Sequence, residues 1–176
     1  MLFRSPTNNW CMELEPQQRS HTTQGTVYVF ANVYMYPEKP GITGKFKKFN
    51  VVTGKTEWEI PDSYPNWGGA LVTAGGLAFY GSLGGDFRAV DRATGKVLWQ
   101  RRLGSGLIGN PITYKVNGKQ YVSVWSGIGG WIGLPVTAGL DLSDKFGAIG
   151  ATAMTKAANL SMIPQGGTLY TFAVGN

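Results

Sequence analysis

The sequence predicts an all-β fold, a partial β-propeller made of four-stranded units. Glycine accounts for 26 of the 176 residues, while 43% of the residues are apolar and 12% are aromatic. This composition favours many short strands joined by tight turns around an aromatic core. The apolar content excludes an intrinsically disordered chain, and glycine at this frequency excludes long helical bundles. A sequence repeat then specifies the propeller.

The repeat has a period of 41 residues. The segment KFNVVTGKTEW at 48–58 aligns with AVDRATGKVLW at 89–99, and a weaker third match, GTLYTF, begins at Gly167. A period near 41 with alternating short strands is typical of four-stranded propeller blades. We therefore expect one partial propeller domain over 1–176, with its parts arranged as follows: repeats at 44–84 and 85–126, an insertion at 127–165 and a closing strand at 166–174.

Alternating patterns and turn residues predict the elements in order. One complete unit contains strands at 70–74, 77–82, 86–90 and 96–102, and the next begins with strands at 110–115 and 120–125. Asn117-Gly118 is a strong hairpin signal between the last two. The insertion reads as loops with a short helix around 148–158, and such insertions emerge on one face of a scaffold, where sites are built.

Three kinds of residue recur in both repeats, and each has a structural explanation. A glycine suits a turn position with positive φ, an asparagine or aspartate accepts hydrogen bonds from turn amides, and a tryptophan packs on the neighbouring blade. We interpret these positions as scaffold rather than catalytic: Gly54 and Gly95, Asn50 and Asp91, Trp58 and Trp99.

The net charge of +6, with a pI near 9.5, permits an anionic partner. The basic residues form no continuous run, however. The densest group, Lys45, Lys47 and Lys48, alternates with Phe46 and Phe49. This alternation indicates one face of an exposed strand rather than a nucleic-acid platform, so we expect no nucleic-acid partner.

Cys11 and His21 are the only cysteine and histidine. They can form neither an internal disulfide nor a structural zinc site, and no acid–base signature supports a Cys–His nucleophile pair. Two interpretations of Cys11 stay open: a buried apolar thiol, or a disulfide with a cysteine outside this chain.

No targeting or membrane segment is expected in these residues. The first ten, MLFRSPTNNW, lack the apolar core of a secretory signal. The uncharged stretch 121–140 is long enough to span a bilayer, but it contains five glycines and Pro135 and opens with the alternating pattern YVSVWSG. We interpret it as a strand followed by a loop.

The motif AxDxxTGxxxW at 89–99, with its variant at 48–58, resembles the tryptophan-docking repeat of pyrroloquinoline quinone (PQQ)-dependent alcohol dehydrogenases. The strings at 8–16, 66–99 and 127–151 resemble the C-terminal part of the methanol dehydrogenase large subunit, nearer to its lanthanide-using branch than to its calcium branch. The resemblance implies the last two to three blades of an eight-bladed quinoprotein propeller. It also implies a periplasmic enzyme, a homodimer when complete, whose signal peptide lies outside this chain.

The resemblance also implies a site. Trp67 matches a tryptophan that lines the quinone pocket in the plane of the quinone ring. Gly130 and Trp131 match a segment whose N–H groups approach the quinone's polar edge, and Cys11 matches a cysteine bonded to an upstream residue. The implied cofactors are PQQ and a lanthanide or calcium ion, whose ligands lie outside this chain, as do the catalytic residues. Such an enzyme oxidises a primary alcohol to the aldehyde by hydride transfer to PQQ and passes electrons to cytochrome c.

Other interpretations remain beside this one. Trp67 can be an inter-blade packing residue and Trp131 a loop anchor. The whole chain can be a non-catalytic propeller scaffold or binding module, or part of a sugar-oxidising relative with the same cofactor. The acidic residues form no paired-carboxylate site, so we expect the chain alone to be inactive.

Overall fold

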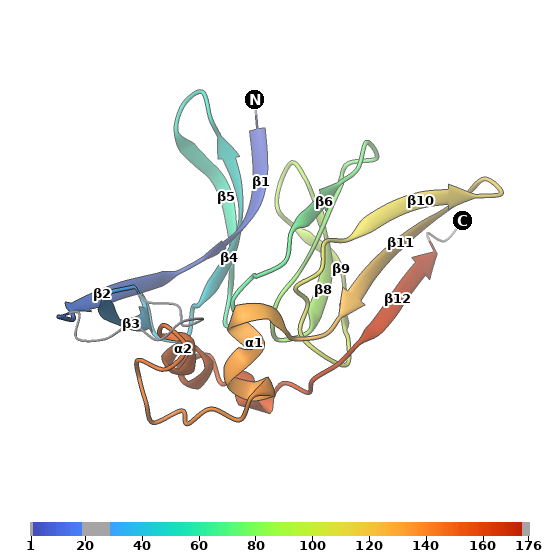
Figure 1. Ribbon diagram of the computed structural model, residues 1–176. Helices are drawn as coiled ribbons and strands as arrows, with labels where there is room; N and C mark the ends of the chain where they lie inside the picture. The colour runs from blue at the N-terminus through green and yellow to red at the C-terminus, as the bar shows by residue number, and fades with distance from the viewer. Residues whose placement is uncertain (1, 19–28, 174–176) are drawn as a thin grey trace.

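The computed structural model describes residues 2–18 and 29–173 (Figure 1). His21 lies outside the described residues. The strands are β1 (Leu2–Asn8), β2 (Trp10–Pro16), β3 (Ala31–Pro37), β4 (Gly44–Asn50), β5 (Lys55–Asp62), β6 (Ala70–Val72), β7 (Leu77–Gly81), β8 (Asp86–Asp91), β9 (Val97–Arg102), β10 (Ile112–Val116), β11 (Lys119–Ser126) and β12 (Thr168–Ala173). The helices are α1 (Gly130–Thr137), α2 (Ala151–Ala157) and a 3₁₀ turn, η1 (Leu160–Met162).

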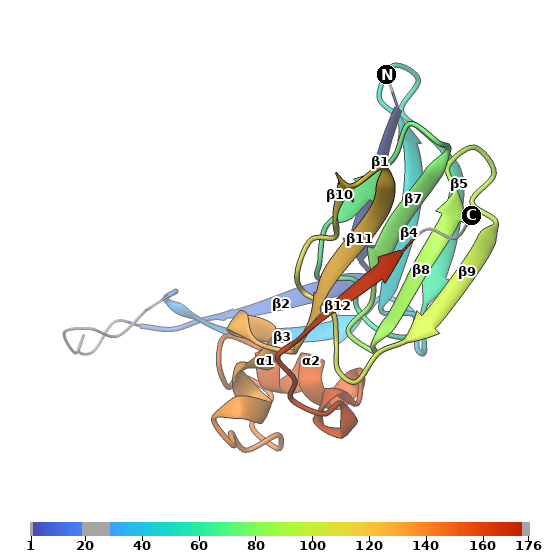
Figure 2. The ribbon, with the colours of Figure 1, turned by 90° about the vertical axis from the view of Figure 1, so that its right-hand side faces the viewer.

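In the described residues these strands form three propeller-like sheets and one hairpin. The first sheet has the order β1-β4-β5, the second β6-β7-β8-β9 and the third β10-β11-β12, all antiparallel. The sheets stand side by side, and the helices lie together at one end of them (Figures 1 and 2). The predicted fold class, an all-β partial propeller, is confirmed.

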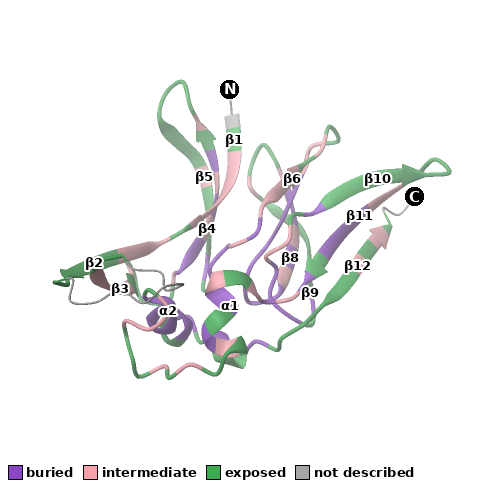
Figure 3. Ribbon diagram, in the orientation of Figure 1, coloured by how far each residue is buried: buried purple, intermediate pink, exposed green. Residues whose placement is uncertain are grey.

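The core lies between the sheets because successive side chains of a strand point to opposite faces. From β7, Ala78 and Tyr80 pack toward the first sheet, where Tyr80 stacks on Phe46 with ring centroids 4.1 Å apart. The adjacent Phe79 packs toward the third sheet with Val122. The second sheet is thus apolar on both faces, and Figure 3 shows the resulting buried stripes along its strands.

The sequence repeat and the sheets are out of phase. The predicted window 44–84 holds β4 and β5 of the first sheet with β6 and β7 of the second. The window 85–126 likewise joins two of the four strands of the second sheet to two of the three strands of the third. The weak match at Gly167 does fall on an equivalent strand, since β12 follows β11 in its sheet as β8 follows β7.

The recurring turn residues adopt the geometry that such turns require. Asp91 Oδ1 accepts hydrogen bonds from the amides of residues 93 and 94, and Asn50 Oδ1 accepts the corresponding pair from residues 52 and 53. The glycines that end the two turns, Gly54 and Gly95, have φ of +69° and +77°. Only a residue without a β-carbon adopts such values freely.

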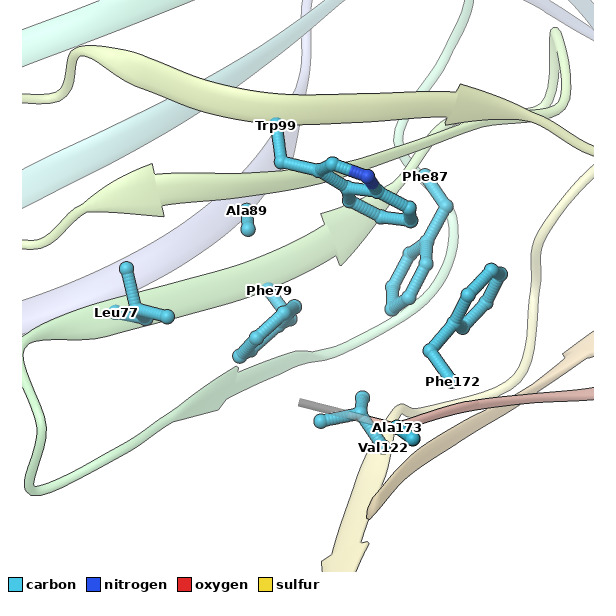
Figure 4. A pocket seen from close by; sticks show the side chains of 8 residues that line it. All are labelled: Leu77, Phe79, Phe87, Ala89, Trp99, Val122, Phe172 and Ala173. Carbon is cyan, nitrogen blue, oxygen red and sulfur yellow. The ribbon is translucent and has the colours of Figure 1, made fainter. Parts of the chain in front are cut away.

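The recurring tryptophans each contact the next sheet. The indole N–H of Trp58, on β5, donates to the Ala93 carbonyl in the turn of the second sheet (2.9 Å). Trp99, on β9, meets Phe172 of the third sheet edge-on, with centroids 5.1 Å apart. Trp99 and Phe172 line an apolar pocket of about 380 Å³ between the second and third sheets (Figure 4).

The three clustered lysines do not share one exposed face, so this expectation was wrong for Lys48. β4 is the middle strand of its sheet, and alternation places Lys48 on the same buried face as Gly44 and Phe46, which leaves its residue 8% exposed. Its ammonium pairs with Glu57 at 2.7 Å. Lys45 and Lys47 both pair with Glu59, so two glutamates on β5 offset two of the three positive charges of the cluster.

The insertion contains a helix that the sequence analysis assigned to a loop. α1 spans Gly130–Thr137 despite Gly133 and Pro135, and α2 lies within the range expected for a helix. The stretch 121–140 is therefore a strand followed by a short helix. In the described residues, no helix is long and apolar enough to cross a membrane.

The hairpin β2–β3 lies beside α2 and runs away from the three sheets (Figure 2). A β-carbon at Gly150, just before α2, would lie 2.8 Å from the Met35 side chain, so glycine permits this close approach. Cys11 on β2 is a free, half-buried thiol opposite Tyr36.

Candidate functional site

Trp67 lies in the linker that leads from the first sheet to the second. The linker begins after Asp62, the last residue of β5, and ends before Ala70, the first of β6. It runs across the end of the sheets where α1 lies (Figure 1). Its middle is fixed by the Leu83 amide, which donates to the Pro65 carbonyl at 2.9 Å. Trp67 is therefore presented from a fixed segment rather than from a free loop.

The two glycines after Trp67 are required by close backbone packing. A β-carbon on Gly68 would lie 3.1 Å from the Gly109 carbonyl oxygen, and one on Gly69 would overlap the Asn110 side chain. The Gly69 amide instead donates to Asn110 Oδ1 at 2.7 Å. Asn110 follows Gly69 by one repeat, so corresponding positions of successive linkers contact each other.

Trp131 lies in the first turn of α1, and its indole N–H donates to the Ala148 carbonyl at 2.6 Å. Gly130 before it has φ of +62°, which favours glycine. Apart from the glycine itself, its chain neighbours and the backbone of its own helix, no described atom lies within 4 Å of the position that a β-carbon at 130 would take. The start of α1 has no side-chain cap, and free amides at a helix start favour an anionic group.

The structure brings Trp67 and Trp131 together. Their ring centroids are 5.9 Å apart, and the ring planes are inclined by 44°. Both indoles are half-buried against one apolar cluster, which they share with the helical insertion: Leu83, Ile128, Ile132, Met154, Ala158, Leu160 and Ile163. The two tryptophans, 64 positions apart in sequence, therefore form one aromatic site at the end of the sheets.

Trp10 packs against the same cluster as Trp67 and Trp131, although no sequence motif predicts a role for it. Its indole nitrogen is buried and has no hydrogen-bond partner in the described part of the chain. The signal that could have found it is its place in NNWCMELEP, one of the three strings that carry the family resemblance.

The shifted titrating groups belong to the scaffold rather than to the aromatic site. Burial raises the pKa of the Tyr80 hydroxyl. Burial is the largest single influence on Arg88 and would lower its pKa, but the charges and hydrogen bonds of Asp62 and Tyr80 together outweigh it, so the net shift of the pKa is upward. Hydrogen bonds from Thr94 lower the pKa of Asp91, and those from Ser143 lower that of Asp141. In residues 2–18 and 29–173, no cluster of His, Cys, Asp and Glu could hold a metal ion.

Comparisons with known proteins agree with this architecture. The family model for the β-propeller domain of PQQ glucose/ethanol/alcohol dehydrogenases matches residues 48–122. The lanthanide-dependent methanol dehydrogenase of Methylacidiphilum fumariolicum is 48% identical over 98% of this chain. A solved europium-containing methanol dehydrogenase superposes on 98% of the chain with a TM-score of 0.92 and 48% identity. Over nearly its whole length, this chain is similar to part of the propeller of PQQ-dependent methanol dehydrogenases.

The match covers this chain almost completely but only a part of each relative. The chain spans 29% of the Methylacidiphilum enzyme and 31% of the europium-containing structure. Methanol dehydrogenase [cytochrome c] subunit 1 of Methylobacterium organophilum is 38% identical over 98% of the chain, which spans 28% of that protein. The chain is thus more similar to the named lanthanide enzyme than to this cytochrome c-linked one.

The aromatic site fits the cofactor of the PQQ dehydrogenases. PQQ is a flat, conjugated tricarboxylate, so it needs apolar ring surface and donors for its carboxylates and carbonyls. Trp67 and Trp131 supply the ring surface, and the uncapped first turn of α1 supplies amide donors beside the open space at Gly130. These three residues would hold one side of the quinone.

Proposed function

We propose that this chain is the C-terminal portion of a quinoprotein methanol dehydrogenase and forms one side of its PQQ channel. The complete enzyme oxidises a primary alcohol to the aldehyde and passes the electrons to cytochrome c. The observation that carries the proposal is the convergence of Trp67 and Trp131 beside the open space at Gly130, in a chain 48% identical to a lanthanide-dependent methanol dehydrogenase.

The role of this chain is to bind and orient the cofactor. The Trp67 and Trp131 indoles exclude water from the quinone's ring surface, and their fixed separation limits how the ring can tilt. The Gly130 backbone leaves room for the quinone's polar edge and presents the first amides of α1 to it. Bound PQQ supplies the acceptor for the hydride of the alcohol. Hydrogen bonds from the α1 amides to anionic groups of PQQ would keep its polar edge in one orientation.

A metal ion supplies Lewis-acid polarisation in this chemistry. Its ligands and the proton acceptor would come from blades outside this chain. The greater identity to an enzyme named as lanthanide-dependent, 48% against 38% for the cytochrome c-linked subunit, supports a lanthanide as this ion. We place the complete protein in the periplasm as a homodimer, with Cys11 bonded to an upstream cysteine.

The outer faces of the terminal sheets support the view that further blades adjoin this chain. On the third sheet Ile112 and Trp125 are 57% and 56% exposed, and Leu169, opposite Trp125 in the register, is 49% exposed. On the first sheet Phe3 and Phe49 are paired across the strands and line an outward groove. Apolar faces of this kind need covering, and the remainder of the propeller would cover both.

A chimera tests the proposal. The corresponding segment of the Methylacidiphilum enzyme is replaced by residues 1–176, and the purified chimera is assayed for bound PQQ and for methanol-dependent dye reduction. We expect PQQ uptake and turnover in the chimera, loss of PQQ with Trp67→Ala or Trp131→Ala, and no loss with the control Val52→Ala, whose residue is 79% exposed in the turn between β4 and β5. A folded chimera without PQQ would instead support the non-catalytic scaffold. Turnover by the isolated chain supplied with PQQ would overturn the claim that the reacting residues lie elsewhere.

A further inference from the structure

Arg88 occupies the middle of the second sheet, on the face toward the first sheet. Side chains alternate along β8: Phe87 packs toward the third sheet and Val90 toward the first, so Arg88 shares the face of Val90. In the strand register Arg88 lies opposite Tyr80 of β7 and Gln100 of β9. The guanidinium therefore stands at the interface between two sheets, with neighbours on both flanking strands.

All three guanidinium nitrogens of Arg88 are used. Nη1 pairs with Asp62 Oδ2 and donates to the Tyr80 hydroxyl at 3.3 Å, Nη2 donates to Asp86 Oδ2 at 3.2 Å, and Nε donates to Gln100 Oε1 at 3.0 Å. The side chains of Arg88 and Asp62 are 12% and 3% exposed. Removing two charges from water costs desolvation free energy, which offsets the attraction between them. The pair therefore contributes by fixing the positions of the two side chains and not by stability alone.

Asp62 connects this network to the linker that carries Trp67. One carboxylate oxygen pairs with Arg88, while the other, Oδ1, accepts the Tyr64 amide at 3.1 Å. A β-carbon at Gly44, the register partner of Asp62, would overlap the Tyr64 carbonyl. The linker therefore packs directly against the first residue of β4. The direction in which the linker leaves β5 is therefore set at Asp62.

The linker residues between Asp62 and Trp67 are also held by contacts with the second sheet. The Tyr64 ring fills the space at Gly84, where a β-carbon would overlap it. The next residue, Pro65, accepts the Leu83 amide, and Trp67 follows two positions later. We propose that Arg88 is a positioning residue for Trp67: through Asp62 it fixes the linker and so sets the angle between the Trp67 and Trp131 indoles.

The proposal rests on the proposed function in one respect only: the angle between the indoles affects cofactor binding only if this site binds the quinone. The angle itself is a property of this chain. A change in the angle alters the ring surface offered to the quinone. It also alters the exciton coupling between the two indoles, which circular dichroism of the chain detects without any cofactor. Failure of PQQ binding would therefore leave this test intact.

The experiment measures the Trp–Trp exciton couplet in the 176-residue chain. Trp67→Phe and Trp131→Phe each remove the couplet and so assign it. Arg88→Met alone leaves Asp62 charged and buried, which can unfold the chain. The decisive variant is therefore the neutral double substitution Arg88→Met with Asp62→Asn, because the amide oxygen of an asparagine at this position can still accept the Tyr64 amide. The matched control is Arg101→Met, an exposed arginine of the same sheet.

We expect the double variant to unfold cooperatively like the parent chain but to lose most of the couplet amplitude. Arg88→Lys keeps the charge without the planar fork and should restore the couplet in part, whereas Arg101→Met should leave it unchanged. A folded double variant with the parent couplet would overturn the proposal, and so would loss of the couplet in Arg101→Met.

Discussion

The ring of Trp58 covers Gly95 so closely that a β-carbon at residue 95 would lie 2.7 Å from the ring atom Cδ2. Trp58 belongs to the first sheet and Gly95 to a turn of the second. The two recurring residues of the repeat are thus the two halves of one contact between neighbouring sheets. This contact explains why glycine and tryptophan recur together at the same period.

The contact predicts that alanine is more harmful at Gly95 than at Gly54. Both glycines have positive φ, so alanine at either costs about 1 kcal/mol in backbone strain. Only at Gly95 does the added carbon also meet the Trp58 ring, whereas the space at Gly54 is open in the described residues. Urea denaturation should show a larger loss for Gly95→Ala, and the excess should disappear in a Trp58→Ala background. Equal losses at both glycines would contradict the contact.

Trp58→Phe should lower the free energy of unfolding by about 1 kcal/mol, the usual worth of one hydrogen bond, because the bond to the Ala93 carbonyl is lost. Trp125→Phe is the matched control, since its side chain lies on the open face of the third sheet. Denaturant midpoints measure both. The prediction fails if the two substitutions have the same effect.

The Asp91 carboxylate should make the folding stability of the chain sensitive to acid. Hydrogen bonds from Thr94 lower the pKa of the folded carboxylate below its ordinary value of 3.8. The carboxylate's stabilisation is therefore complete above pH 3.8 and is lost as the pH falls through the lower, folded value. Asp91→Asn removes the titration, and Asn50 shows that asparagine supports the same turn. Thermal unfolding from pH 7 to pH 3 should show a flatter acid limb for Asp91→Asn. An unchanged acid limb would show that Asp91 does not contribute.

The apolar outer faces predict association of the isolated chain. Trp125 and Leu169 are paired in the register on the outer face of the third sheet, where they are 56% and 49% exposed. Size-exclusion chromatography should show oligomers or aggregates, and Leu169→Lys should raise the monomer fraction, because a charge on such a face opposes association. A sharp monomer peak for the parent chain would count against the truncated-ring account.

The sequence predicted those features that depend on local chemistry and repetition. The turns at Asn50 and Asp91, the strands around them and the family resemblance follow from residues adjacent in the chain. The proximity of Trp67 and Trp131 depended on the resemblance, because no local pattern links residues 64 positions apart.

Features decided by tertiary packing were missed. α1 contains two glycines and a proline, so its propensity is low, and it forms because Ile132 and Pro135 are buried against the core. Lys48 lies on the buried face of Phe46, and its burial depends on the ion pair with Glu57 of β5, which the pattern of its own strand does not show. The role inferred for Arg88 depends on contacts with β5 and β9, which its own strand does not show.

The structure of the PQQ-loaded chimera is the most direct test of the central claim, that these strands form one side of a quinone channel. The account predicts both indoles, Trp67 and Trp131, within about 4.5 Å of the quinone ring, the range of ordinary non-polar contact. Quinone bound elsewhere, with the two indoles packed only against their own sheets and helices, would contradict it.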